Sequence, residues 1–526
     1  MTPLPPPAPV ANRASPSREH PDAAARRALL RLGAEPKNWV LPTAGVERDV
    51  VIVGGGQAGV TVAFALRRFG ITNVSVIDEA PEGEAGVWLT RARMNTLRTP
   101  KTVSGPELGI PELSFQAWYE GLNGEAAYAA IGRIARTDWA EYLKWYQRIV
   151  AVPVQHRTRL DVIEPAGGHL RLHVSENGAG RIVTTRKVVL ANGMTGTGGP
   201  FTPAFISEHL PAPLWAHTAD AIDFGALRNK TVAVLGGATS AFDAAAVALE
   251  QGAAEVHLFY HRSDLAGALG GTALAAWMVR AFPGVQDNYH LLPDEDRWRL
   301  RLKQRAMGTL CPFDSVLRAT RFPNFRLHLN APWHAVREKQ GRVALDAGDG
   351  SFVFDFALAG TGYQYDPNTR PELRLIAKDI ALWRDRFQPS EGQEADDLAV
   401  YPYVGPAYEF LERTPGTAPH LKNIHAYNMG ASLSFGRPVG DVPGLRTEVP
   451  RLAAAINRDL FFSDYGAHLQ RMLFPPPAPP TAAHGPADFD RGQYEHAIYR
   501  GAPADPSSST VTSSTSIPHS HVSSHA

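Results

Sequence analysis

The stretch DVVIVGGGQAGVTVAFALRRFG, residues 49–70, decides the fold of this 526-residue chain. It begins with the apolar run 50–53, which predicts a buried β-strand, and continues as a helical pattern that ends at Gly70. Between strand and helix, residues 54–59 have the pattern G-x-G-x-x-G. A strand, this turn and a helix in that order are typical of a dinucleotide-binding unit.

Each glycine of the turn has a physical role. Gly54 permits the tight turn, Gly56 lets the backbone approach a pyrophosphate, and Gly59 lets the helix pack closely on the strand. Gln57 begins the helix, whose N-terminus offers free N–H groups and the positive end of its dipole to the phosphates. We predict that these four residues bind the nucleotide.

An acidic pair follows the next strand, residues 74–77. In a dinucleotide-binding unit an acid about 20 residues after the turn hydrogen-bonds a ribose. Both Asp78 and Glu79 are available, and we predict Asp78, because it directly follows the apolar pair Val76 and Ile77.

A second copy of the unit, TVAVLGGATSAFDAAAVALEQG, occupies residues 231–252, which is 182 residues further on. The following strand, residues 256–259, keeps the same offset from residues 74–77. Strands that alternate with helices indicate parallel α/β structure. The repeat therefore predicts an α/β fold with two Rossmann-like dinucleotide-binding domains, the second inserted into the first.

The second turn is a relaxed version of the first. Gly236 is kept, but alanines replace the second and third glycines, and Ala238 holds the pyrophosphate slightly farther from the backbone. This suits a nucleotide that exchanges, and we predict that Gly236, Ala238 and Ser240 bind it. Tyr260 replaces the ribose-binding acid, and Arg262 follows it with a guanidinium that can grip a phosphate. These features favour NADPH over NADH.

Two dinucleotide folds in one chain imply two nucleotides. We expect a tightly bound FAD in the first domain and NADPH in the second, because hydride must pass from a nicotinamide to an acceptor flavin.

Composition excludes several classes of protein. Lys and Arg number 52, as do Asp and Glu, so no basic face for nucleic acid is expected. The single cysteine, Cys311, excludes a disulfide framework, a four-cysteine zinc site and a dithiol redox centre. No apolar run spans a membrane and no signal peptide is evident, so a cytoplasmic location is expected. The tail histidines His519, His521 and His525 lack accompanying acids or cysteines, and we predict no metal site.

Five segments follow from these patterns. Residues 1–38 are predicted to be a disordered leader and residues 475–526 a disordered low-complexity tail. The FAD-binding domain is expected at residues 39–205 and 355–474, and the NADPH-binding domain at residues 206–354.

Short motifs next to these units resemble those of flavin-dependent monooxygenases. Gly86-Val87-Trp88 resembles the G-x-W in which the tryptophan packs near the flavin. MNTLRTPK, residues 94–101, is similar to the T-L-R-x-P segment that passes beside the isoalloxazine in amine N-hydroxylating monooxygenases. RTDWAEYLKW, residues 136–145, resembles a helix of the same enzymes, with Asp138 in place of their Glu, and its aromatic face predicts a core helix.

Three further stretches support the resemblance. Residues 359–363 resemble the A-T-G-Y strand end, and residues 191–193 resemble the A-T-G crossover between the domains. Residues 428–434 resemble an N-x-x-x-H-G-L-S loop over the flavin, with Asn428 kept and the histidine lost. Together the motifs resemble class B flavin-dependent monooxygenases over residues 45–460.

The sequence departs from that class in two places. Of its F-x-G-x-x-x-H fingerprint only His217 survives, and Ala92 stands where the N-hydroxylases carry a lysine. A substrate therefore cannot be transferred directly from the ornithine or lysine enzymes.

The resemblance implies reduction of FAD by NADPH, addition of O₂ at the flavin C4a, and transfer of one oxygen to a small organic substrate. It makes Arg98 and Asn95 the candidate catalytic residues, and Trp88 and Asn428 further FAD-binding residues. It leans toward N-hydroxylation of an amine. S-oxygenation, Baeyer–Villiger oxygenation and an NADPH-dependent quinone or ferredoxin reductase stay open as alternatives, and the oligomeric state is left open.

Overall fold

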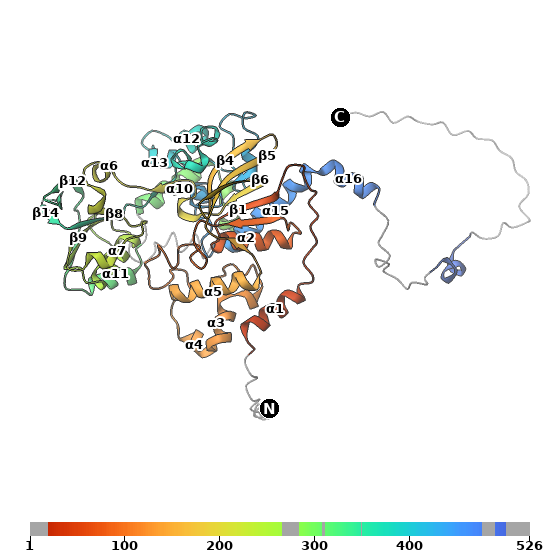
Figure 1. The fold of residues 1–526 in the computed structure, drawn as a ribbon, viewed down its shortest axis with the longest axis horizontal. Coiled ribbons are helices and arrows are strands. Elements are labelled where there is room, and N and C mark those ends of the chain that lie inside the picture. The colour runs from red at the N-terminus through yellow and green to blue at the C-terminus, as the bar shows by residue number, and fades with distance from the viewer. Residues whose placement is uncertain (1–18, 266–282, 308–310, 349, 476–489, 501–526) are drawn as a thin grey trace, which may run out of the picture. The chain divides into compact units, whose positions relative to one another are not determined.

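The computed structural model describes residues 19–265, 283–307, 311–348, 350–475 and 490–500. Contacts divide the chain into two units, residues 1–464 and 465–526. The first unit contains both nucleotide-binding domains (Figure 1). The second contains helix α16 (Tyr465–Leu473) and two short 3₁₀ turns, Arg491–Gln493 and Glu495–Ala497. Among the described residues, no helix has the length and apolar character needed to cross a membrane.

The elements of the first unit follow in chain order. The helices are α1 (Pro21–Arg31), α2 (Gln57–Arg68), α3 (Phe115–Asn123), α4 (Glu125–Ala130), α5 (Arg136–Ile149), α6 (Ala204–Ser207), α7 (Thr239–Glu250), α9 (Pro283–Asn288), α10 (Asp294–Met307), α11 (Phe313–Thr320), α12 (Trp383–Arg386), α13 (Asp396–Ala399), α14 (Ser432–Phe435) and α15 (Leu445–Ser463). The strands are β1 (Arg48–Val53), β2 (Val74–Ile77), β3 (Val154–Gln155), β4 (Thr158–Ala166), β5 (His169–Glu176), β6 (Ala179–Leu190), β7 (Gly199–Pro200), β8 (Trp215–His217), β9 (Thr231–Leu235), β10 (Glu255–Phe259), β11 (Phe325–His328), β12 (Trp333–Lys339), β13 (Arg342–Ala347), β14 (Gly350–Phe354), β15 (Phe356–Ala359), β16 (Tyr363–Gln364) and β17 (Ile424–His425).

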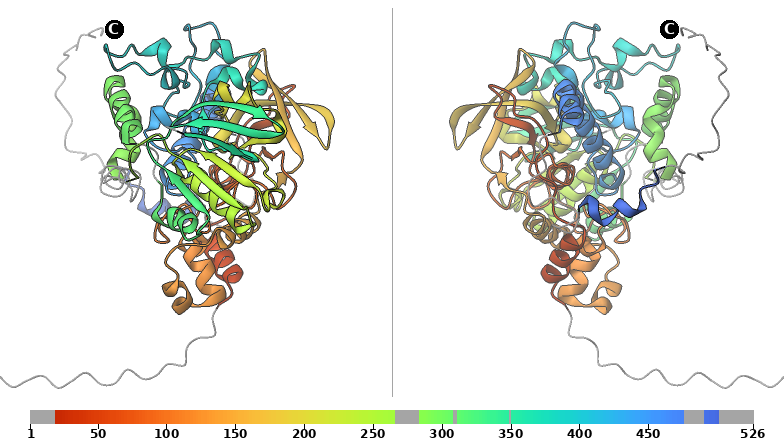
Figure 2. Two further views of the ribbon diagram at one scale, coloured as in Figure 1. Left: turned by 90° about the vertical axis from the view of Figure 1, so that its left-hand side faces the viewer. Right: turned by 90° about the vertical axis from the view of Figure 1, so that its right-hand side faces the viewer.

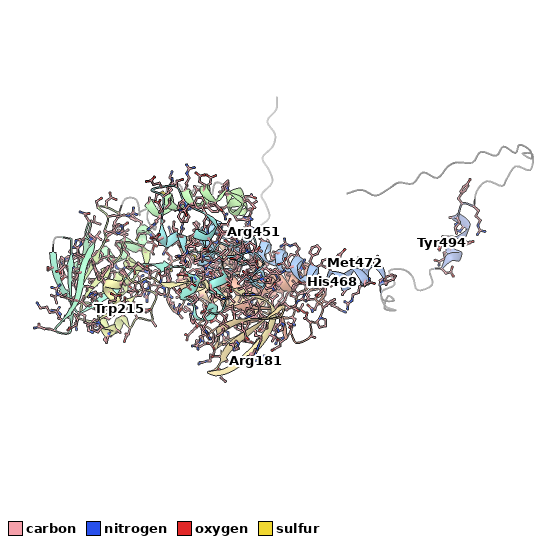
Figure 3. All side chains as sticks on the ribbon, turned by 90° about the horizontal axis from the view of Figure 1, so that it is seen from above. Arg181, Trp215, Arg451, His468, Met472 and Tyr494 are labelled. Atoms are coloured by element: carbon pink, nitrogen blue, oxygen red, sulfur yellow. The ribbon has the colours of Figure 1, made fainter. Side chains whose placement is uncertain are left out.

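The first domain is built on a sheet with the strand order β3-β2-β1-β6-β5-β4, with β17 beside β6. Strands β1, β2, β3, β6 and β17 pair in parallel, whereas β4, β5 and the first half of β6 form an antiparallel extension. Helix α2 packs against this sheet and against α15. In Figure 3, Arg181 marks β6 and Trp215 marks the start of β8 in the second domain.

The second domain has an all-parallel sheet with the order β11-β10-β9-β15-β8. Alternate residues of β9 face opposite sides, so Val232 and Val234 join the core under α7 and α11 while Ala233 joins the core under the β12–β14 meander. Both faces are therefore covered, as the apolar strand sequence requires.

The two copies of the repeat pair with the same register. Val50 lies opposite Val74 in the first sheet, and Val232 lies opposite Val256 in the second. Each pair differs from its counterpart by the 182 residues of the sequence repeat. The predicted α/β fold with two Rossmann-like domains is confirmed.

Two segments are exchanged between the domains. Helix α10 belongs in sequence to the second domain, between β10 and β11, yet it packs on the first: Trp298 Nε1 donates to the carbonyl of Gln393 at 2.8 Å, and Arg301 Nη2 donates to the Tyr401 hydroxyl at 3.2 Å. Figure 2 shows α10 to one side of the second sheet. Conversely, the first-domain residue Arg93 donates to the carbonyl of Asp220 at 2.9 Å.

The structure corrects two predicted boundaries. Residues 21–31 of the predicted leader form helix α1, in which Ala25 is fully buried and Asp22 pairs with Arg148 at 2.6 Å. Composition missed this helix because long-range contacts hold it. Strand β15 belongs to the second sheet, so a boundary at residue 355 is wrong by one strand. Residues 1–18 of the leader and most of the tail, with its three histidines, lie outside the described residues.

Candidate nucleotide-binding and active site

At two positions of the first turn, contacts with the surrounding backbone require glycine whether or not a ligand is bound. Gly54 has φ +111°, and a Cβ there would lie 2.5 Å from the carbonyl oxygen of Ala191. A Cβ on Gly59 would overlap the carbonyl oxygen of Gly54. Gly56 differs, because the nearest atom to its Cβ would be Gly86 Cα at 3.4 Å, an ordinary contact. The space beside Gly56 is therefore open to a ligand.

Helix α2 begins at this turn with no side-chain cap, because its N-cap residue is Gly56. The N–H groups of the first helical turn have no acceptor within the helix. They point to the carboxyl edge of the parallel sheet and suit the pyrophosphate of a dinucleotide.

Asp78 lies at the end of β2 beside the turn and is 9% exposed. One carboxylate oxygen accepts the N–H of Gly55 at 2.6 Å, and the other accepts the N–H of Ala80 at 2.8 Å. An ionised carboxylate has about four acceptor positions, so two remain for ribose hydroxyls. Glu79 is exposed.

The side chain of Gln57 is held by three partners. Its Oε1 accepts from the indole N–H groups of Trp88 and Trp139, both at 3.3 Å, and its Nε2 donates to the carbonyl of Gly440 at 3.0 Å. Gln57 therefore ties the turn to the segment before α15, and its backbone N–H is the group available to a nucleotide. Trp139 is 2% exposed, which confirms that α5 is a core helix.

A cleft opens beside the first turn. It is lined by Gly55, Gly56, Gln57 and Val60, by Gly83, Ala85, Trp88 and Leu89 after β2, by Ala140, Leu143, Lys144, Tyr146 and Gln147 of α5, and by His156. The buried Nδ1 of His156 has no hydrogen-bond partner among the described residues. An open cleft, an uncapped helix and an acid at the end of β2 fit the adenosine diphosphate half of FAD. The sequence prediction missed His156, although its place directly after β3, next to β2, is a usable signal.

The second turn repeats this arrangement. Gly236 has φ +127°, and a Cβ there would overlap the carbonyl oxygen of Gly360. Helix α7 begins after Ala238 without a side-chain cap, and Ser240 in its first turn is exposed. These residues fit a second pyrophosphate.

Tyr260 occupies the position that Asp78 has in the first domain. A Cβ on Gly237 would overlap its ring, so the ring lies directly on the turn and no acid is present there. Arg262 donates from Nη1 to the carbonyl of Ala306, the residue before the end of α10, at 2.8 Å. Its contact with a 2′-phosphate stays a prediction.

Asn95 and Arg98 lie on the first-domain segment that meets the second domain, and both are exposed. Although the Arg98 side chain reaches solvent, desolvation by the surrounding protein lowers the pKa of its guanidinium, and the negative charge of Asp243 acts in the opposite direction. The described residues provide no hydrogen-bond or ion-pair partner for its guanidinium. Arg98 is thus available to a bound anion or polar ligand.

Asn428 has a different surrounding from the other predicted binding residues. It is fully buried; its Nδ2 donates to the carbonyl of Leu190 at 3.0 Å, and its Oδ1 accepts from Gly430 N–H at 3.0 Å and from the Thr197 hydroxyl at 3.1 Å. Asn428 therefore ties its loop to the crossover after β6, and its contact with FAD stays a prediction.

A redox disulfide within the chain is excluded, because the sequence has a single cysteine. Cys311 is the single cysteine and is buried, and burial raises the pKa of its thiol to about 12. The part of the chain that the structure describes contains no group of three His, Cys, Asp or Glu side chains able to hold a metal ion. Two uncapped glycine turns without a cysteine pair define an oxidoreductase that binds two dinucleotides and has no redox disulfide.

Known proteins identify the family. Residues 51–281 match the family described as Pyridine nucleotide-disulphide oxidoreductase. The chain is 40% identical over 449 residues to the FAD-dependent urate hydroxylase of Xanthomonas campestris, which covers 84% of this chain and 93% of that protein. It therefore belongs to the family of that FAD-dependent hydroxylase.

Solved structures share the fold. The ornithine hydroxylase of Pseudomonas aeruginosa is 16% identical, with a TM-score of 0.62 over 79% of this chain and 100% of that chain. The L-lysine 6-monooxygenase of Pseudomonas syringae is 19% identical, with a TM-score of 0.61 over 78% of this chain and 99% of that chain. At these identities the likeness concerns the fold alone.

Proposed function

We propose that this FAD- and NADPH-dependent monooxygenase hydroxylates urate or a closely related purine. The observation that carries the proposal is the 40% identity with a urate hydroxylase across 93% of that protein's length. The match extends over 449 residues, 84% of this chain.

In this proposal, separate groups of residues bind the two nucleotides. The first turn and Asp78 bind FAD, and the second turn with Arg262 binds NADPH. Bound FAD, once reduced by NADPH, supplies the activation of O₂. The protein brings both nucleotides together, excludes water and orients the substrate.

Arg98 and Asn95 are the proposed residues nearest the reaction. Urate is a planar anion near neutral pH, and the Arg98 guanidinium has no partner among the described side chains. A planar guanidinium matches such an anion in shape and charge. Asn95, which is exposed on the same segment, can both donate and accept hydrogen bonds.

N-hydroxylation of an amine is the second candidate. The T-L-R-x-P motif at residues 96–100 favours it, and so does the fold of the ornithine and lysine enzymes. Ala92, which replaces their lysine, argues that an amino acid is not held as it is in those enzymes. A simple quinone or ferredoxin reductase is not favoured.

The test is a substrate panel on purified flavoprotein. NADPH oxidation and O₂ uptake are measured with urate, xanthine, L-ornithine and L-lysine, and products are identified by mass. We expect urate to accelerate NADPH oxidation and to gain one oxygen atom. An oxygenated amine without any product from a purine would favour the second candidate, and quinone reduction without O₂ uptake would refute both.

A further inference from the structure

Helix α7 carries a buried acid that the proposed function leaves unused. Asp243 lies one turn inside the helix that begins at the second glycine turn, and its side chain is 4% exposed. Its Oδ1 has no hydrogen-bond partner among the described residues. A buried carboxylate is costly unless it is paired with a cation or fully hydrogen-bonded.

The repeat shows that helix packing does not require this acid. The equivalent position in α2 is Thr61, which is also fully buried, and its hydroxyl donates to the carbonyl of Gln57 at 2.6 Å. In the first domain, this position is thus occupied by a neutral threonine that makes a hydrogen bond within its own helix. The carboxylate of Asp243 therefore calls for an explanation outside the packing of α7.

Arg318 is the nearest cation, but it has other partners. Its Nη1 lies 3.8 Å from Asp243 Oδ1, which is too long for a hydrogen bond. The same guanidinium makes two hydrogen bonds with Glu250, at 2.9 and 2.6 Å, and donates to the carbonyl of Arg93. Arg318 thus mainly neutralises Glu250. The Ser315 hydroxyl donates a hydrogen bond to Asp243, which leaves Oδ1 as the carboxylate oxygen without a hydrogen bond among the described residues.

Arg98 is the other cation at this boundary. The segment that carries it is held against α11 by Thr96, whose hydroxyl donates to Asp314 at 3.4 Å, and by Arg318 through Arg93. Burial raises the pKa of Asp243. The hydrogen bond from Ser315 opposes this shift most, followed by the positive charges of Arg98 and Arg318. The segment with Arg98 and the Oδ1 of Asp243 therefore meet at the same part of the domain boundary, although no ion pair within 4.0 Å joins the two side chains among the described residues.

We propose that Asp243 is a positioning residue that pairs with Arg98 across the domain boundary. The acid lies on the helix that receives NADPH, and Arg98 lies on the segment of the FAD domain. The pair holds the guanidinium between the two nucleotides, where it can bind the substrate. The substrate-binding role of Arg98 rests on the proposed function, whereas the pairing of Asp243 with Arg98 does not.

The pairing is tested first by stability. The free energy of unfolding is measured for wild type, Asp243→Asn, Arg98→Ala and the double variant. Asparagine keeps the size of the side chain and removes the charge. We expect Asp243→Asn to change the unfolding equilibrium constant about threefold less in the Arg98→Ala background than alone. Additive effects would overturn the inference, whatever the enzyme's activity.

The second readout is coupling, the product formed per NADPH oxidised. A poorly held substrate lets NADPH and a proton reduce O₂ to hydrogen peroxide, leaving NADP⁺. We expect Asp243→Asn to lower coupling about threefold, Asp243→Glu to restore most of it, and Asp243→Asn to add nothing to Arg98→Ala. Glu255→Gln, which removes an acid of β10 that pairs with Arg326, is the control and should keep wild-type coupling. Normal coupling in Asp243→Asn would refute the positioning role, whereas a wild type that oxidises no NADPH would refute the proposed function and leave the pairing to the stability cycle.

Discussion

The backbone N–H of Gly55 donates to the carboxylate of Asp78 at 2.6 Å, across 23 residues of chain. In the second domain the equivalent residues are Gly237 and Tyr260, and there an aromatic ring lies on the turn. The same backbone geometry thus presents an acid in one domain and a neutral ring in the other. This difference supports the proposal that the two turns bind different nucleotides.

Asp78→Asn is expected to weaken FAD binding roughly 10–150-fold, because a charge-assisted hydrogen bond of about 1.5–3 kcal/mol to the ribose is lost. The dissociation constant is measured by flavin fluorescence. Glu79→Gln is the matched control and should bind FAD normally, since Glu79 is exposed. The reverse outcome would make Glu79 the ribose-binding acid.

Gly56→Val is expected to empty the FAD site without unfolding the protein, because the new side chain points into open space beside the turn. We expect FAD affinity to fall more than about tenfold, while the unfolding midpoint of the flavin-free protein changes little. Gly132→Val is the control, since a Cβ on Gly132 has no atom within 4 Å. A Gly56→Val protein with full flavin content would contradict the placement of the pyrophosphate.

Arg262→Ala is expected to raise the KM for NADPH roughly 10–150-fold and to leave NADH little changed. Arg262 now donates to neutral carbonyls, and a 2′-phosphate is a stronger, charged acceptor. Arg305→Ala removes a nearby positive charge that pairs with Asp397, and serves as the control. Equal effects of Arg262→Ala on both coenzymes would show that Arg262 does not read the 2′-phosphate.

His156→Ala is expected to weaken FAD binding about fivefold and to leave FMN binding unchanged. A nucleotide with its pyrophosphate on the turn and its ribose on Asp78 carries its adenine past β2, toward the residue that follows β3. FMN lacks the adenosine, so the two flavins separate the ends of the site. The exposed His334 gives the control variant His334→Ala. An equal loss of FMN would place His156 beside the isoalloxazine.

Stability is expected to fall as pH rises through the range in which Glu448 ionises. Glu448 is 2% exposed; its Oε2 accepts from Gly440 N–H at 2.9 Å, and it shares Arg437 with Asp441. Burial raises the pKa of Glu448 to about 7. The folded protein therefore binds this proton more tightly than the unfolded chain, where a glutamic acid has a pKa of about 4.3.

The contribution is complete below the unfolded pKa and is lost as pH rises through about 7. Glu448→Gln stays neutral and should flatten the decline of the unfolding midpoint between about pH 5 and pH 8 by roughly 2–5 °C. Parallel pH profiles for the wild type and the variant would show that Glu448 is ionised throughout.

Local sequence signals predicted the nucleotide units well. Short apolar strands, glycine turns and a constant offset depend on neighbouring residues, and β1, β2, β9 and β10 lie where these signals placed strands. Contacts between distant residues could not be predicted in this way. The hydrogen bond from the Gln57 side chain to the Gly440 carbonyl joins residues 383 positions apart, and no local sequence pattern predicts it. The contact of Thr96 with Asp314 likewise depends on how two domains meet.

The exchange of segments between the domains has a mechanical consequence. Helix α10 completes the surface of the FAD domain, and the segment around Arg93 completes the edge of its neighbour. Loss of structure in the second domain would withdraw Trp298 of α10 from its apolar neighbours in the first, which include Trp383. Heat or denaturant is therefore expected to melt both in a single cooperative transition, and a chain cut between them should yield no independently soluble half.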